Sequence, residues 1–262
     1  MTTAINKKAV AQSFSKAASH YDSVAHLQMQ MGQALLQRLP SDRSFSRALD
    51  IGCGTGQVTR HLTQMADVVT ALDFAPGMLQ FAREHHGDVI AEFVCADADD
   101  LPFDAGSFDL VFSNFVLQWC ESLSALMCRL HDVLLPGGLL AFSLPGERTL
   151  WELKQSWRQA DAQHVHVNQF PSLLAVEHSV KQAGFSLLMA ERQQQTLYYP
   201  SVRALTHELK TLGAHNVNEG RSTHLTGKQT MARFIDRYES LRTAHGLPAT
   251  WDIVQIVACK PD

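Results

Sequence analysis

The stretch "ALDIGCGTGQVTRHL", residues 48–62, joins a short apolar run to three glycines at alternate positions. Gly52, Gly54 and Gly56 have no Cβ, so the backbone of this loop can come close to a ligand. We expect a strand to end in the loop and a helix to begin after it. The first N–H groups of such a helix have no partner within the helix and suit a carboxylate or a phosphate.

An acid before the glycines distinguishes this loop from a dinucleotide-binding loop. The dinucleotide fingerprint is Gly-x-Gly-x-x-Gly, and its ligand is a pyrophosphate. Here the spacing is Gly-x-Gly-x-Gly, and Asp50 lies two residues before the first glycine. A carboxylate at this place would repel a pyrophosphate but would suit an ammonium group. The loop therefore indicates a zwitterion, with its carboxylate on N–H groups and its ammonium beside an acid.

Two more acids end the apolar runs that follow. Asp73 ends "VVTALD", where an acid can accept hydrogen bonds from both hydroxyls of a ribose. Asp97, in "FVCADADDLPF", could accept from the exocyclic amine of an adenine, while the N–H of Ala98 faces a ring nitrogen. Each acid alone could equally be a solvated loop residue or a helix N-cap. Together with the glycine loop they indicate an amino acid, a ribose and an adenine, which are the parts of S-adenosylmethionine.

Apolar runs alternate with helical stretches through this region. The predicted strands are 47–51, 68–72, 88–94, 108–113 and 138–144, and the predicted helices are 57–65, 76–84 and 122–134. A turn at 135–138 is expected to end the last helix. This alternation predicts an α/β fold, with a parallel sheet and helices on both faces.

The sequence on either side of this region is predicted to be mostly helical. Residues 5–39 have a helical apolar stripe, and further helices are expected at 147–162, 172–183, 201–212 and 227–243, with a loop at 163–171. Residues 185–199 could form a strand, and 250–259 a closing strand. We therefore predict one domain over 1–262: a helical cap (1–40), a cofactor-binding core (45–145), a mostly helical substrate-side insertion (147–247) and a closing strand (250–260).

Composition fits a soluble enzyme. The 262 residues are 45% hydrophobic with a net charge of −4, which gives no global attraction to nucleic acid or anionic membrane. The N-terminus has no apolar signal core, so a cytoplasmic protein is expected. His85-His86 and the pair His164 and His166 lack Cys or clustered acids in metal-site spacing, so exposed polar side chains are favoured over a metal site.

Four segments resemble the sequential motifs of class I S-adenosylmethionine-dependent methyltransferases: "LDIGCGTG", "VTALDFAPGML", "CADADDLPF" and "FDLVFSNFVLQW". The resemblance covers about residues 45–145. It implies a Rossmann-like sheet of seven strands with the last one reversed, and a helical lid. It also implies cofactor contacts at Asp50, Gly52, Cys53, Gly54, Gly56, Asp73, Asp97 and Ala98, with Phe74 and Met78 around the ribose and adenine and Asn114 near the methyl group.

The remaining segments resemble the malonyl-[acyl-carrier protein] O-methyltransferase family of biotin synthesis. They are "SFSKAASHYDSVAHLQ" (13–28), "HVHVNQF" (164–170), "LKTLGAHNVNEGR" (209–221) and "LTGKQ" (225–229). The resemblance implies methylation of the free carboxylate of a malonyl thioester on acyl-carrier protein or coenzyme A. Gln169 replaces an Arg of some relatives. The closing "LPATWDIVQIVACKPD" leads us to expect no second fused domain.

A malonyl carboxylate is ionised near pH 7, so the reaction needs alignment more than a base. Tyr21 is the first candidate for a catalytic residue that orients the carboxylate, although it could merely pack the N-terminal helix. Gln28 could touch the amino-acid end of the cofactor or be a surface residue. The anionic substrate suggests Arg148, Lys210 and Arg221 as binding residues, with Lys154 and Arg203 as further candidates; each could also lie on a solvated helix face. Phe142, Trp151, Trp157 and Phe170 could wall the pocket or pack the core.

Three alternatives remain open at this point. The chain could methylate another small acceptor, such as a quinone precursor or a free dicarboxylate. It could bind S-adenosylmethionine without turnover. It could be a nicotinamide dehydrogenase, although the loop spacing and Asp50 disfavour that function.

Overall fold

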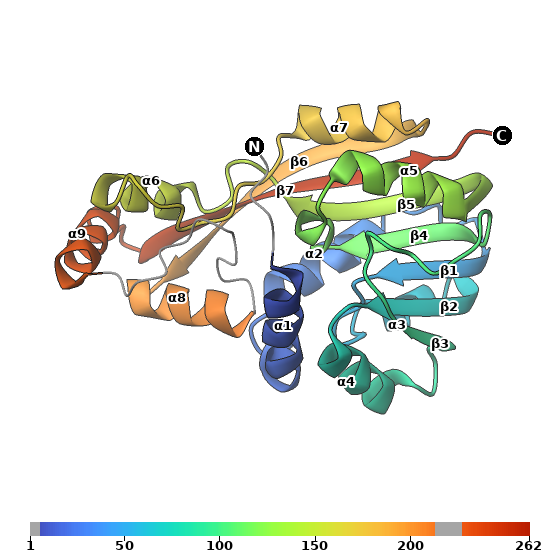
Figure 1. The fold of residues 1–262 in the computed structure, drawn as a ribbon, viewed down its shortest axis with the longest axis horizontal. Helices are drawn as coiled ribbons and strands as arrows, with labels where there is room; N and C mark the ends of the chain where they lie inside the picture. Colours follow the sequence, from blue (N-terminus) through green and yellow to red (C-terminus); the bar gives the residue numbers. More distant parts are fainter. Residues whose placement is uncertain (1–5, 213–226) are drawn as a thin grey trace.

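The computed structural model describes residues 6–212 and 227–262, and their strands form one seven-stranded sheet (Figure 1). The strand order is β3-β2-β1-β4-β5-β7-β6. Strands β1 to β5 run parallel, whereas β7 is antiparallel to both β5 and β6. The strands are β1 (Phe45–Ile51), β2 (Ala66–Asp73), β3 (Glu92–Cys95), β4 (Phe108–Asn114), β5 (Leu134–Pro145), β6 (Ser186–Tyr199) and β7 (Leu247–Cys259). The predicted fold class is confirmed, including the reversed last strand.

Helices cover both faces of the sheet. They are α1 (Lys7–Tyr21), α2 (His26–Leu36), α3 (Thr59–Leu62), α4 (Pro76–His86), α5 (Leu123–Val133), α6 (Trp151–Ala160), α7 (Leu173–Gln182), α8 (Val202–Thr211) and α9 (Lys228–Glu239). Leu49 and Ile51 of β1 join the core that α5 and α7 complete. The neighbouring Ala48 joins the core on the other face, with α2 and α3. Successive side chains of a strand point to opposite faces of the sheet. Because helices cover both faces, every position of such a strand is buried, which explains the continuous apolar runs.

The carboxyl ends of the parallel strands form the edge at which a site is expected. Strand order reverses between β1 and β4, and ligands of open α/β sheets bind in the crevice outside such a reversal. Figure 1 shows these strand ends directed toward α1, with α6, α8 and α9 beyond them. No helix in the described part of the chain is both long and apolar enough to cross a membrane.

A second apolar core lies in this outer part of the molecule. It joins side chains of α6, α8 and α9 to the long strands β6 and β7, which pair from Ser186–Cys259 to Tyr199–Leu247. The predicted 147–247 insertion therefore includes a strand of the main sheet, because β6 runs from the edge of the sheet into the helical part. The proposed division into cap, core and insertion stays a prediction.

Besides small shifts of element ends, four predicted elements differ clearly from the observed ones. The expected helix over 5–39 is two helices, because a turn at 22–25 separates α1 from α2. The strand expected from 88 begins at Glu92, and the helix expected over 57–65 is only Thr59–Leu62. Residues 135–138 lie within β5, where Gly137 has φ +71° and the pairing with β4 shifts register, and so do not form a separate turn.

Candidate active site

The glycine loop follows β1 and already uses most of its own N–H groups. The N–H groups of Gly52 and Cys53 donate to the Leu72 carbonyl at 2.7 and 3.0 Å. Gly56 N donates to the Cys53 carbonyl at 3.0 Å, and helix α3 is a single turn. The N–H groups of the three glycines are therefore already paired, because Gly54 N donates to Asp73 Oδ2. Among the described residues that line the hollow beside this loop, the backbone N–H groups of Thr55, Gln57 and Val58 have no backbone partner.

Asp50 stands buried at the end of β1, with 2% of its surface exposed. Its Oδ2 accepts a 2.6 Å hydrogen bond from the Thr59 hydroxyl. Burial raises the pKa of Asp50 to about 7 and nearby Asp73 adds to the rise, while the Thr59 bond opposes it. Burial disfavours the ionised form of Asp50, and a cationic ligand beside it would stabilise that form.

Asp73, at the end of β2, ties the glycine loop to the start of α4. Its Oδ2 accepts from Gly54 N at 3.0 Å and its Oδ1 from Ala75 N at 2.8 Å. Burial raises its pKa to about 6, and the backbone hydrogen bonds work against that rise. Each carboxylate oxygen has a second lone-pair direction, so Asp73 can still accept two hydroxyl groups of a ligand.

Asp97, beyond β3, is held by a residue that the sequence prediction missed. Lys7 Nζ lies 2.7 Å from Asp97 Oδ2 and also pairs with Asp99. Burial alone would lower the pKa of Lys7, but these acids raise it to about 12. Asp97 Oδ1 accepts from Asp99 N at 3.0 Å. These ion pairs hold the first turn of α1 against the loop that follows β3.

Three connected hollows lie along the ends of β1, β2 and β3. The first is lined by Gln28, Asp50, Gly52, Cys53, Gly54 and Asn114; the second by Gly52, Gly54, Asp73, Phe74, Met78 and Asn114; the third by Lys7, Gly52, Phe74, Asp97 and Ala98. The structure therefore brings together every predicted cofactor residue except one. Gly56 packs against α4, where an added Cβ would lie 2.9 Å from the His86 ring.

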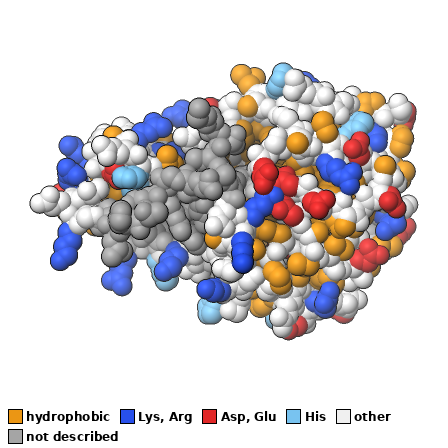
Figure 2. All heavy atoms as spheres, viewed as in Figure 1, with side chains coloured by type: hydrophobic (Ala, Val, Ile, Leu, Met, Phe, Trp, Pro, Cys, Tyr) orange, Lys and Arg blue, Asp and Glu red, His pale blue; other side chains and the backbone are white. Residues whose placement is uncertain are grey.

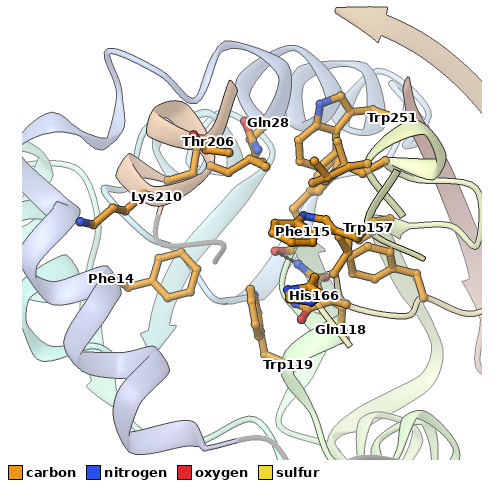
Figure 3. Close-up of a pocket in the computed structure, with 18 of the residues that line it drawn as sticks. Phe14, Gln28, Phe115, Gln118, Trp119, Trp157, His166, Thr206, Lys210 and Trp251 are labelled. Carbon is orange, nitrogen blue, oxygen red and sulfur yellow. Dashed lines mark hydrogen bonds between the residues drawn. The ribbon is translucent and has the colours of Figure 1, made fainter. Parts of the chain in front are cut away.

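A larger apolar cavity adjoins these hollows (Figure 3). Its walls come from α1, α6, α8, β7 and the segment after β4. Trp157 stacks on His166 at 3.8 Å and on Phe234 at 3.9 Å between ring centroids. Phe115 and Leu150, which have φ of +57° and +53°, both line the cavity. Such conformations cost roughly 1–3 kcal/mol outside glycine and cluster at ligand sites.

Tyr21 and Gln28 stand on either side of the 22–25 turn, and both line the cavity and the first hollow. Asp22 fixes this turn to the glycine loop, because its carboxylate accepts from Thr55 Oγ1 at 2.6 Å and Gln57 Nε2 at 3.2 Å. Burial, and then the charges of Asp73 and Asp22, raise the pKa of Tyr21, so its hydroxyl stays protonated near neutrality. The two side chains thus mark the boundary between the hollows and the cavity.

Comparison with known proteins agrees with this architecture. Residues 49–142 match the family model described as "Methyltransferase domain". The chain is 40% identical over 267 residues to malonyl-[acyl-carrier protein] O-methyltransferase of Gallionella capsiferriformans, covering 98% of this chain and 92% of that protein. The chain belongs to the malonyl-[acyl-carrier protein] O-methyltransferase family.

Other members of this family are longer. Biotin biosynthesis bifunctional protein BioHC of Cellvibrio japonicus is 47% identical over 261 residues, covering 100% of this chain and 52% of that protein. The chain therefore spans about half the length of this bifunctional relative. Among solved structures, YcgJ protein from Bacillus subtilis has a TM-score of 0.64 at 16% identity, covering 89% of this chain and 99% of that one, which shows a shared fold.

The predicted substrate-binding cations lie in different places. Lys210 lines the cavity at its α8 wall, whereas Arg203 lies exposed on the same helix. Arg148 is exposed outside the cavity, and its backbone N–H donates to Asp252 Oδ2 at 3.0 Å. Lys154 stands 5.0 Å from the Phe170 ring centroid, and burial lowers its pKa to about 8. Arg221 lies outside the described residues.

The expected exposure is wrong for His86, which is buried, and for His166, and the structure now places four aromatic residues that the sequence left between cavity wall and core. His166 is not an exposed side chain: it lines the cavity and pairs with Asp161 at 2.9 Å, which, with His164, lowers the pKa of Asp161 to about 2. Trp157 and Phe170 line the cavity, but Phe142 is core and Trp151 lies on the surface. Within the described residues, no group of three His, Cys, Asp or Glu side chains is placed to hold a metal ion.

The N-terminal helix supplies Tyr21, which the sequence predicted, and two site residues that it overlooked, Lys7 and Phe14. Lys7, Phe14 and Tyr21 are seven residues apart and lie on one face of α1, over the hollows. Trp119 faces Phe14 edge-on, with 5.8 Å between ring centroids. The heptad spacing was present in the sequence and could have indicated a helix that covers a cleft.

Proposed function

We propose that the protein transfers the methyl group of S-adenosylmethionine to the free carboxylate of a malonyl thioester on acyl-carrier protein. The observation that carries this proposal is adjacency: hollows lined by Asp22, Asp50, Asp73 and Asp97 share Tyr21 and Gln28 with a mostly apolar cavity. The family to which the chain belongs supports the choice of acceptor. The neutral methyl ester would then enter pimeloyl and biotin synthesis.

The donor set of the hollows fits this cofactor. Asp50 would meet the ammonium group, and the N–H groups of Thr55 and Gln57 the carboxylate. Asp73 would accept from the ribose hydroxyls, and Asp97 with Ala98 would meet the adenine. When bound, S-adenosylmethionine supplies an electrophilic methyl: a carboxylate oxygen forms the new O–C bond, the C–S bond breaks with its electron pair left on sulfur, and no proton moves. The remaining product is S-adenosylhomocysteine.

The apolar cavity suits a reaction in which opposite charges disappear. A carboxylate and a sulfonium become an ester and a thioether, and water would stabilise the charged reactants more than the transition state. Phe14, Trp119 and Phe115 line both sides of the junction and make it apolar. The chain therefore needs to orient the acceptor, and the Tyr21 hydroxyl is placed to hold one of its oxygens.

The charge distribution supports an acidic carrier as the substrate. Figure 2 shows Lys and Arg side chains over the end of the molecule that contains α6, α8 and α9. Exposed cations on α8 and α9 are Arg203, Lys210, Lys228, Arg233 and Arg237. Because the whole chain has a net charge of −4, this local positive surface would steer an anionic partner toward the cavity.

Mass spectrometry tests the proposal. Malonyl-carrier protein incubated with the enzyme and S-adenosylmethionine should gain the mass of one methylene, and the gain should vanish when acetyl replaces malonyl. Free malonate, a quinone precursor and malonyl-coenzyme A are assayed in parallel. Methylation of free malonate or of the quinone precursor, with none of malonyl-carrier protein, would replace the proposed acceptor; cofactor binding without any product would indicate a non-catalytic module.

Cofactor affinity should increase with pH through the pKa of Asp50. That pKa is about 7 in the described structure, and an ammonium group stabilises only the ionised form. Between pH 7.5 and pH 6 we expect the Kd of S-adenosylmethionine to rise roughly tenfold, because binding must then release a proton. Calorimetry across this range measures the slope. Asp50→Asn, which has no such proton, should bind more weakly with a shallower profile, because Asp73 still titrates near pH 6. An equally steep profile would disprove this role of Asp50.

Replacing Tyr21 by phenylalanine should lower turnover more than cofactor affinity. The ring and its contact with Phe14 (6.3 Å between centroids) remain, so only the hydroxyl is lost. One hydrogen bond to a charged group contributes about 1.5–3 kcal/mol, so we expect kcat to fall at least tenfold while cofactor Kd changes less than threefold. Unchanged turnover would show that Tyr21 only packs the helix.

A further inference from the structure

Five residues line both the acceptor cavity and the hollows proposed for the cofactor: Phe14, Tyr21, Gln28, Phe115 and Trp119. The transferred methyl group must cross this boundary, so the accepting oxygen must lie beside it. Within the described chain, no lysine or arginine belongs to this group. Tyr21 and Gln28 are the residues at the boundary with flexible polar ends, and both are uncharged.

Gln28 is fixed in place and has an unsatisfied amide. Its side chain is 9% exposed, and its Oε1 is buried without a hydrogen-bond partner among the described residues. Its backbone carbonyl accepts from Asn114 Nδ2 at 2.9 Å, and Asn114 Oδ1 accepts from Ser143 Oγ at 2.7 Å. Helix α2 is thereby fixed to the ends of β4 and β5. Figure 3 shows Gln28 directed into the cavity.

The unpaired Oε1 is an acceptor, and leaving it buried without a donor costs roughly 1–3 kcal/mol, which indicates that a ligand donor such as the cofactor ammonium completes it. We propose that Gln28 donates an amide hydrogen bond to the methyl-accepting carboxylate, a role that rests on the proposed function. The amide Nε2, at the other end of the same group, carries two donor hydrogens and can bind a carboxylate oxygen. Gln28 also lines the hollow in which the cofactor ammonium is expected, so one amide can contact both ligands.

An uncharged donor suits this reaction better than a cation would. The carboxylate loses its negative charge when the ester forms, so a lysine or arginine at this position would stabilise the ground state more than the transition state. An amide and a hydroxyl orient the two oxygens with a smaller electrostatic penalty. Gln28 and Tyr21 would therefore select the accepting carboxylate at the boundary, whereas the cations of α8 and α9 would attract the carrier protein.

Two variants separate this role from cofactor binding. Gln28→Met keeps the length of the side chain and removes the donor, and Gln28→Glu keeps the shape and adds a negative charge. Gln30→Met is the control, because Gln30 is exposed on the same helix. Calorimetry measures the Kd of S-adenosylhomocysteine, and then the Kd of malonyl-carrier protein for the enzyme loaded with it. Steady-state kinetics at saturating cofactor gives kcat and KM, and thermal melting verifies folding.

For Gln28→Met we expect about tenfold weaker binding of malonyl-carrier protein and a cofactor Kd within twofold of wild type. Gln28→Glu should weaken binding of malonyl-carrier protein further, because it places a second carboxylate beside the malonyl carboxylate. The Gln30→Met control should match wild type. Loss of cofactor affinity with unchanged acceptor affinity would assign Gln28 to the cofactor and overturn the proposal. Unchanged values for both ligands would make it a packing residue. Should one variant not fold, the other decides alone. The wild-type assay with malonyl-carrier protein tests the proposed function separately.

Discussion

Replacing Asp73 by alanine is expected to weaken S-adenosylmethionine binding at least a hundredfold. The carboxylate is proposed to accept both ribose hydroxyls, and hydrogen bonds to a charged group contribute about 1.5–3 kcal/mol each. Its loss also frees the N–H groups of Gly54 and Ala75, which the carboxylate now holds at 3.0 and 2.8 Å. The loop and the helix start would then separate at the middle of the site. Calorimetric titration with the cofactor and with S-adenosylhomocysteine measures the effect.

The matched variant for this prediction is Asp73→Asn. Asparagine keeps one acceptor oxygen at nearly the same place and removes the charge, so it should lose less affinity than alanine. Asp109 provides a distant control, because its carboxylate accepts from Ser46 N and Arg47 N at 2.7 and 2.9 Å, away from the hollows. Asp109→Ala should destabilise the fold without changing cofactor Kd in the folded protein. If Asp73→Ala bound the cofactor as tightly as wild type, the ribose assignment would be wrong.

The part of the site that the sequence predicted well is the part built from local signals. Asp50, Asp73 and Asp97 each follow a short apolar run, and parallel strands bring their carboxyl ends to one edge. The order of strands and helices could therefore be read from runs and turns alone. Side-chain chemistry at three strand ends then indicated the kind of ligand.

The cavity could not be predicted in the same way, because its walls come from residues far apart in the chain. Trp251 of β7 lies in one wall with Tyr21 of α1, and only tertiary packing brings them together. The sequence left Phe142 between the cavity wall and the core, and the structure shows it fully buried on the α5 and α7 side of the sheet. The turn after β5 directs the Arg148 N–H to Asp252 and its side chain to solvent. Lys7, in contrast, was missed by the sequence prediction, because its role depends on an ion pair with the distant Asp97 that no local pattern reveals.

Replacing Gly52 by alanine should disrupt the site much more than replacing Gly54. Both glycines have positive φ, +73° and +55°, so an alanine at either position costs about 1–2 kcal/mol of backbone strain. At Gly52 the added Cβ would also lie 2.1 Å from Val116 Cγ2, whereas at Gly54 it meets nothing within 4 Å. Overpacking of this kind typically adds about 1–3 kcal/mol.

We therefore expect Gly52→Ala to lower the free energy of unfolding by about 2–5 kcal/mol, and Gly54→Ala by only about 1–2 kcal/mol. Urea denaturation without cofactor measures both, so that ligand contacts do not enter the comparison. Val116 lines the second and third hollows, and its displacement by the Gly52→Ala methyl should also reduce cofactor affinity at least a hundredfold in the protein that still folds. A second replacement, Val116→Ala, makes room for that methyl and should recover part of both losses. Equal destabilisation by the two single variants, with no recovery, would show that backbone conformation alone, and not the close approach of Val116, requires glycine at the end of β1.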